Sequence, residues 1–281
     1  MLEELSVIFR WLSLGLLIVA TVLYAYQFTM QKKNLFRWAR VITGAGLLFL
    51  TAAIGTRPFA FDGTQLTGSH STLVLLAWAL LVLYFAVEHF LKIKIYGVAL
   101  VPVVVLLLLV AQLQSGAAGE GLATREYDLV DSWRVGIHVA MILAANALFA
   151  VGGLAAVFYL LQDAQLKAHK TSTLFKRLPS LSQAQALARR AIALAYPIYT
   201  AGIFLGIVRA VETGVEGWYS DPRIIMSGFV WMIYGVYLLR VYRHGISARS
   251  ASWIAVLGIV AVVSISVLAR TLPVGFHLFA L

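Results

Sequence analysis

Long apolar runs, separated by short polar or basic segments, dominate the chain. A helix that crosses the hydrocarbon core of a bilayer needs about 20 residues, and most of these runs approach or exceed that length. The pattern predicts eight membrane spans, over residues 5–29, 41–56, 71–91, 95–113, 133–162, 191–211, 223–242 and 252–272. We therefore expect an all-α fold, a polytopic membrane helix bundle that forms one integral-membrane domain over residues 1–281.

Basic residues gather between alternate spans. The segments after the first, third, fifth and seventh spans hold fifteen of the 22 Lys and Arg residues: Lys32, Lys33, Arg37, Arg40, Lys92, Lys94, Lys167, Lys170, Lys176, Arg177, Arg189, Arg190, Arg240, Arg243 and Arg249. Basic loops mark the cytoplasmic side of a membrane protein. We therefore expect a multi-pass protein of a bacterial-type inner (cytoplasmic) membrane, with both termini on the extracytoplasmic side.

The composition excludes several classes of protein. With 61% hydrophobic and 12% charged residues and a mean hydropathy of +0.89, the chain cannot cover the surface of a soluble domain. The formal net charge of +10 belongs to the basic loops, so we expect the lipid bilayer and not nucleic acid as a partner. The chain has no cysteine, which excludes thiolate metal sites, disulfide exchange and covalent thioether attachment to it.

The segment 163–190 is basic and amphipathic. We expect it to form a loop along the cytoplasmic membrane surface. Pro179 interrupts it, and Ser180 or Ser182 is placed to cap the helix that continues into the sixth span.

Three histidines fall at the predicted outer edge of the membrane. His70 opens the third span, His138 lies near the outer end of the fifth, and His277 follows the eighth. A single histidine at this depth is more often an interfacial residue. Imidazole is also the usual nitrogen ligand of haem iron, and two on facing helices can hold a porphyrin. Arg134, one turn before His138 on the same helix face, could contact an anionic group of the ligand.

His89 cannot share an iron with His70. Nineteen residues of helix separate them by about 28 Å, which places them at opposite faces of the membrane. We expect Glu88 and His89 to form a solvated cluster at the inner interface, beside Lys92 and Lys94.

The sequence gives little support to other kinds of chemistry. The chain shows no phosphate-binding glycine loop, zinc-protease helix or serine nucleophile elbow. No carboxylate lies in the middle of a predicted span, which argues against a proton pump with a buried acid relay. Whether the chain is an enzyme stays open, and we favour a carrier or assembly factor over a catalyst.

Several segments resemble one family in their order and spacing. They are LPSLSQAQALARRAIALAYPIYTAGIFLGIVRA, WYSDPRIIMSGFVWMIYGVYLLRVYR, IHVAMILAANALFAVGG and GFHLF. This pattern is similar to the cytochrome c assembly proteins of the CcsA, ResC and HemX type, over most of the chain from about residue 70. The resemblance implies haem handling, with His138 and His277 corresponding to the external histidines that ligate haem.

The loop between those two histidines departs from the family pattern. Trp218, Tyr219, Asp221 and Pro222 remain, but Arg223-Ile224 replaces a Lys-Glu pair and several tryptophans are missing. The resemblance implies that Trp218 and Tyr219 cover a haem face and that Asp221 also belongs to the haem-binding site. The haem propionates would bind Arg134, with further candidates in Arg125, Arg209, Arg223 and Arg270.

The leading hypothesis is a membrane protein that carries or presents non-covalent haem b at the outer face, in haem handling or cytochrome c-type biogenesis. It would act with a membrane partner protein of cytochrome c assembly or of a respiratory complex. One alternative is an accessory or electron-transfer subunit of a larger membrane complex, although the inner face offers only His89 for a second haem. Another is a structural or assembly protein that has lost haem.

Overall fold

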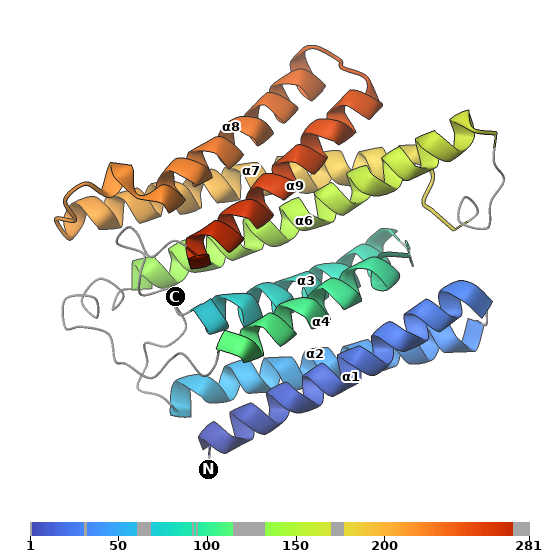
Figure 1. Cartoon of the computed structure of the whole chain (residues 1–281), viewed down its shortest axis with the longest axis horizontal. Helices are drawn as coiled ribbons and strands as arrows, with labels where there is room; N and C mark the ends of the chain where they lie inside the picture. Colours follow the sequence, from blue (N-terminus) through green and yellow to red (C-terminus); the bar gives the residue numbers. More distant parts are fainter. Residues whose placement is uncertain are drawn as a thin grey trace. The chain divides into compact units, whose positions relative to one another are not determined.

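Long α-helices make up nearly all of the part of the chain that the structure describes. The structure is a computed structural model, and it describes residues 2–30, 33–60, 69–91, 93, 95–114, 133–169 and 177–271. The helices in these ranges are α1 (Leu2–Met30), α2 (Lys33–Ala60), α3 (Ser69–Leu91), α4 (Ile95–Gln114), α6 (Trp133–Lys167), α7 (Leu181–Glu212), α8 (Pro222–Arg243) and α9 (Ala248–Thr271) (Figure 1). All eight are long and apolar enough to cross a membrane, which confirms the predicted polytopic all-α fold.

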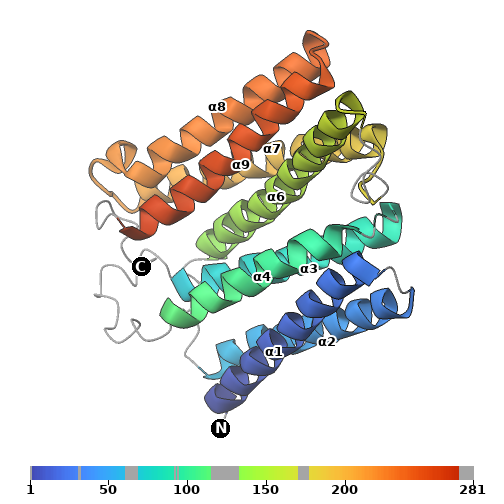
Figure 2. The ribbon, with the colours of Figure 1, turned by 45° about the vertical axis from the view of Figure 1, so that its right-hand side comes forward.

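The chain divides into two compact units, Met1–Val130 and Asp131–Leu281. In the first unit, α1 lies along α2 and α4, and α3 lies along α4. In the second unit, α6 lies along α7 and α9, while α8 packs against both α7 and α9 (Figure 2). Each unit is thus a small bundle whose helices follow one another closely in sequence.

Two helices begin well before the apolar runs that predicted them. α2 starts at Lys33 and α7 at Leu181, so both include basic residues as well as their apolar span. Ser180 caps α7: its hydroxyl accepts a hydrogen bond from Gln183 N at 3.3 Å, and the Gln183 side chain accepts one from Ser180 N at 3.2 Å. Of the two predicted cap residues, Ser180 and Ser182, the structure confirms Ser180. Within the segment 163–190, α6 continues to Lys167, residues 170–176 fall outside the described residues, and the membrane-surface position stays a prediction.

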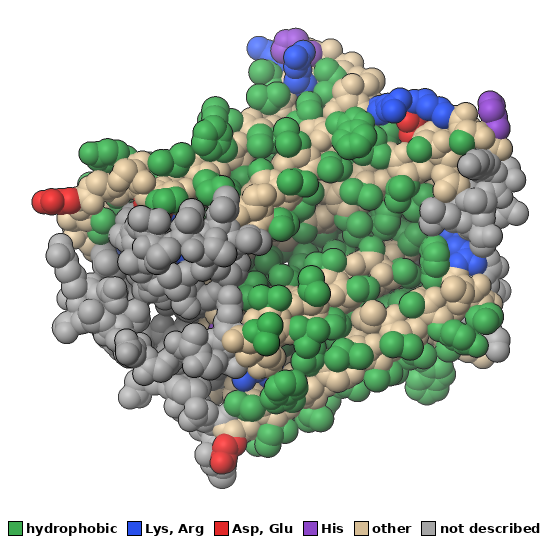
Figure 3. Space-filling model, in the orientation of Figure 1, with side chains coloured by type: hydrophobic (Ala, Val, Ile, Leu, Met, Phe, Trp, Pro, Cys, Tyr) green, Lys and Arg blue, Asp and Glu red, His purple; other side chains and the backbone are tan. Residues whose placement is uncertain are grey.

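The flanks of the helices carry apolar side chains that the protein itself does not cover. Phe90, for example, is 77% exposed, and Leu48 and Phe204 are also largely exposed. Figure 3 shows hydrophobic side chains along the helices in view, with Lys, Arg and His side chains gathered at helix ends. This distribution fits a bundle whose flanks face lipid.

An aromatic stack forms the centre of the second unit. The rings of Phe149 and Tyr234 lie parallel with centroids 3.7 Å apart, and Tyr199 meets Phe149 edge-on at 5.5 Å. Gly258 makes room for this stack on α9, because a Cβ atom there would lie 2.5 Å from Cζ of Tyr234. A small residue therefore lets α8 and α9 approach closely, as is common between membrane helices.

We expect Gly258→Ala to destabilise the second unit. The added methyl group would force Tyr234 out of the stack, and such overpacking typically costs about 1–3 kcal/mol. The thermal unfolding midpoint of the purified protein in detergent measures this. Gly228→Ala is the matched control, because a Cβ atom at Gly228 on α8 would meet no atom within 4 Å. Equal midpoints for the two variants would contradict the close packing.

Candidate functional site

His138 lies near the start of α6 and contacts the backbone of α7. Its Nδ1 atom is 2.7 Å from the carbonyl oxygen of Gly202. A carbonyl oxygen can only accept, so Nδ1 carries the hydrogen and donates it. In the neutral ring the lone pair is therefore on Nε2. A hydrogen bond from the other ring nitrogen to a backbone carbonyl is the usual way in which proteins orient a metal-binding histidine.

The His138 ring packs against Gly206 of α7, which has no side chain. A Cβ atom at Gly206 would lie 2.7 Å from Cε1 of His138 and 2.9 Å from Nδ1. At Gly202, one turn earlier, a Cβ atom would lie 2.9 Å from Cδ1 of Ile142. The sequence pattern includes Leu205-Gly206, but its role in seating His138 was missed. Gly206 thus leaves room for the imidazole, and Gly202 leaves room for Ile142, between α6 and α7.

Arg134, at the start of α6, forms an ion pair with Glu212, at the end of α7. Its Nη1 atom lies 2.5 and 2.6 Å from the two carboxylate oxygens of Glu212. Its guanidinium carbon also lies 5.8 Å from the centre of the Trp133 ring. Arg134 precedes His138 by four residues, so both side chains leave α6 on one face. The structure thus pairs Arg134 with a carboxylate of the protein itself, and its contact with a ligand stays a prediction.

Asp221 caps α8. Its side chain is buried, with 3% exposed, and Oδ1 accepts a hydrogen bond from Arg223 N at 2.8 Å. Pro222 occupies the first helical position, where its missing N–H leaves no hydrogen bond unmade. Sequence reasoning placed Asp221 at the ligand, and the structure gives it a helix-capping role. Whether it also touches a ligand stays a prediction.

Trp218 and Tyr219 lie in the short helical turn η1 (Trp218–Ser220) between α7 and α8. Gly217 precedes the turn with φ +70°, a left-handed conformation that favours glycine. The two rings meet edge-on with centroids 6.0 Å apart, and Tyr219 is 69% exposed. Trp218 is only partly exposed, and the position of the two rings over a haem face stays a prediction.

Whether the three predicted histidines lie together stays a prediction. His277 lies outside the described residues, so its pairing with His138 stays a prediction. His70 belongs to the first compact unit, where it is 7% exposed. Its Nδ1 lies 2.8 Å from the carbonyl oxygen of Ala111, and its Nε2 lies 2.6 Å from Nη1 of Arg10. Both ring nitrogens of His70 are therefore engaged within that unit.

Sequence reasoning also missed a buried acid in the first unit. The hydroxyls of Tyr24 and Tyr84 lie 2.5 Å apart, and Tyr84 donates to Oε2 of Glu88 at 2.5 Å. Oε1 of Glu88 lies 3.3 Å from Nε of Arg40. The prediction of a solvated Glu88–His89 cluster is wrong for Glu88, which is buried, whereas His89 is exposed. Hydropathy could not show this, because Arg40 comes from another helix, α2, and Tyr84 is bonded in turn to Tyr24 of α1.

Known proteins match most of this chain. The model of a family described as "Cytochrome C assembly protein" matches residues 67–277. The "Cytochrome c biogenesis protein CcsA" of Prochlorococcus marinus (strain MIT 9303) is 26% identical over 255 residues, which cover 82% of this chain and 80% of that protein. The protein of the same name from Trieres chinensis is 24% identical over 273 residues, 87% of each chain. "Protein HemX" of Brevibacillus brevis is 32% identical over 106 residues, 38% of this chain and 39% of its own.

We expect replacement of Glu88 to destabilise the first unit in steps. Glu88→Leu removes the acceptor of Tyr84 and the ion pair of Arg40, at a cost of about 1–3 kcal/mol. Glu88→Gln keeps an acceptor oxygen, so its loss of stability is smaller. His89→Gln, at the adjacent exposed residue, is the control and leaves stability unchanged. Thermal unfolding in detergent orders the variants, and a Glu88→Leu protein as stable as wild type would contradict the assigned contacts.

Proposed function

Because the chain belongs to the cytochrome c assembly protein family, as its sequence predicted, we propose that it acts in cytochrome c biogenesis and holds haem b at the outer face of the cytoplasmic membrane. The family match covers residues 67–277, and the two CcsA relatives align with more than four fifths of the chain. The observation that carries the haem proposal is the hydrogen bond from Nδ1 of His138 to the carbonyl of Gly202.

The surroundings of His138 fit an axial ligand. Nδ1 donates to the backbone of α7, the lone pair of the neutral ring is on Nε2, and Gly206 leaves room for the ring. His277 is the second ligand in this proposal. His70 is left out of the pair, because both of its ring nitrogens already have partners. A haem held by His138 and His277 would suit haem carriage or one-electron transfer rather than oxygen chemistry.

The outer ends of α6 and α7 offer a place for the propionates of haem. Arg134 already binds a carboxylate there, that of Glu212, through short contacts to both of its oxygens. A propionate carries the same chemical group, so it would compete with Glu212 for the guanidinium. Trp218 and Tyr219 follow Glu212 within one short loop and are the aromatic residues proposed to cover haem.

The distribution of basic residues supports the membrane orientation that the proposal requires. With the basic loops in the cytoplasm, both termini and the His138 end of α6 face outward, where c-type cytochromes are assembled. The haem is held without covalent attachment, because the chain has no cysteine to form a thioether. A membrane partner protein of cytochrome c assembly would receive the haem and complete the attachment.

Haem content of the purified protein tests the ligands. We expect His138→Ala and His277→Ala to abolish the split low-spin absorption bands of the reduced protein. Gly206→Ala pushes the His138 ring off α7 and lowers haem affinity by roughly 10-fold, as for other groups that orient a metal ligand. His169→Ala and Gly136→Ala are the controls, because His169 lies at the opposite end of α6 and nothing lies near a Cβ atom at Gly136. A folded His138→Ala protein with full haem content would refute the assignment.

The Arg134–Glu212 pair gives a separate prediction. Arg134→Gln should weaken binding of iron protoporphyrin IX by about tenfold, the loss of one charge-assisted hydrogen bond. Glu212→Gln removes the competing carboxylate and should strengthen binding. Neither variant should change the affinity for the dimethyl ester of the porphyrin, which has no charged propionate. Equal effects on the acid and the ester, measured by absorbance titration of apoprotein, would show that Arg134 acts on the fold and not on the ligand.

A further inference from the structure

Arg10 carries a positive charge into the apolar length of α1. It lies eight residues after Leu2, about 12 Å along the helix axis from the start of α1. Its Nη1 atom contacts Nε2 of His70 at 2.6 Å, and its Nε atom is buried without a hydrogen-bond partner in the part of the chain that the structure describes. Among those same residues no acidic side chain forms an ion pair with Arg10.

His70 does not neutralise this charge. The carbonyl oxygen of Ala111 accepts from Nδ1–H, so the neutral ring has its lone pair on Nε2 and accepts from Arg10 there. A neutral imidazole orients the guanidinium but adds no negative charge. The pair therefore keeps the full charge of Arg10, and a charge inside a membrane protein ordinarily has a partner.

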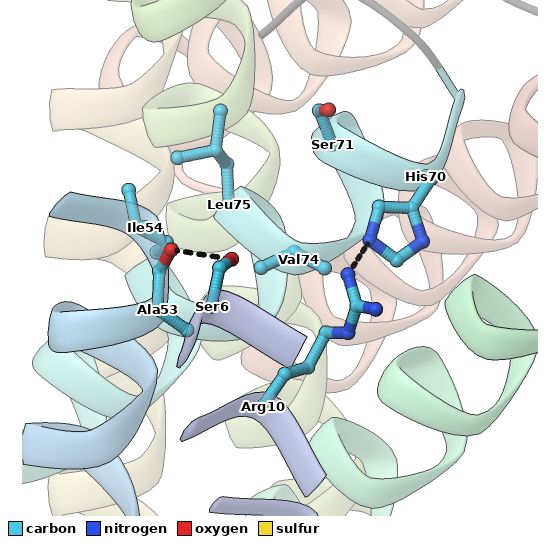
Figure 4. Close-up of a pocket in the computed structure, with 8 residues that line it drawn as sticks. All are labelled: Ser6, Arg10, Ala53, Ile54, His70, Ser71, Val74 and Leu75. Atoms are coloured by element: carbon cyan, nitrogen blue, oxygen red, sulfur yellow. Dashed lines mark hydrogen bonds between the residues drawn. The ribbon is translucent and has the colours of Figure 1, made fainter. Parts of the chain in front are cut away.

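A small cavity opens beside this guanidinium. Ser6, Arg10, His70 and Ser71 contribute its polar lining, and apolar residues of α2 and α3 complete the wall. Figure 4 shows Arg10 reaching from α1 to the His70 ring, with the Ser6 hydroxyl bonded to the carbonyl of Ala53. The cavity volume is about 20 Å³, which is room for one atom the size of a water molecule.

We propose that this Arg10 cavity binds one anionic atom. Arg10 supplies the charge and a buried N–H donor that has no partner among the described residues, and the Arg10–His70 contact fixes the guanidinium. The volume admits a chloride ion or a single oxygen reaching in from the phosphate of a phospholipid headgroup. The proposal involves only the first compact unit, so it is independent of haem binding at His138.

Chloride binding tests the proposal directly. The full-length protein is stripped of lipid in a maltoside detergent, with gluconate as the bulky background anion, and titrated with chloride. The ³⁵Cl NMR linewidth reports binding, and the thermal unfolding midpoint reports its effect on stability. We expect saturable broadening and a rising midpoint for wild type, and affinity at least tenfold weaker for Arg10→Gln. Arg10→Lys keeps the charge but lacks the Nε–H donor, so it should fall between the two.

Arg37→Gln is the matched control, because Arg37 is an exposed cation of the same unit. It should keep the full chloride response. If chloride has no effect, native mass spectrometry of protein purified without delipidation identifies the second source. A phospholipid retained by wild type and Arg37→Gln but lost from Arg10→Gln would assign the anionic oxygen to lipid. If the wild type and Arg10→Gln behave alike in both experiments, or if Arg37→Gln loses the response as well, the proposal is wrong.

Discussion

The hydrogen bond between His138 and the Gly202 carbonyl is the contact on which the candidate site depends. It fixes the proton on Nδ1 and turns Nε2 into the nitrogen that can meet a metal. The contact exists because α7 presents glycines at two positions one turn apart, where any side chain would displace the ring or the neighbouring Ile142. The close packing of α6 on α7 therefore also determines which nitrogen of the imidazole carries the proton.

A second constraint is the lack of water inside a bilayer, which leaves polar groups to find partners within the protein. The first unit meets it at one end with Tyr24, Tyr84, Glu88 and Arg40, whose hydroxyls and charges form a connected set. Arg10 differs, because its buried Nε–H has no hydrogen-bond partner and its charge has no ion-pair partner among the described residues. That contrast within one small bundle is the reason to assign a bound anion to the Arg10 cavity.

The sequence predicted the number, type and approximate position of the spans, because apolar length alone decides whether a helix can cross a bilayer. It predicted the start of α7 less well, since the cap at Ser180 begins the helix ten residues before the apolar run. His138 could be chosen from its membrane depth. Its partner Gly202 could not, because 64 residues separate the two and only packing joins them. For the same reason the pairing of Arg134 with Glu212 was not foreseen.

The position of the iron is the most direct test of the central claim that an outward-facing imidazole of α6 ligates haem. A cryo-electron microscopy structure of the protein, purified from cells supplied with haem, would locate it. The account predicts iron bonded to Nε2 of His138, with Nδ1 still donating to Gly202 and His277 at the opposite axial position. Haem bound elsewhere on the chain, with the His138 ring packed away from it, would contradict the account.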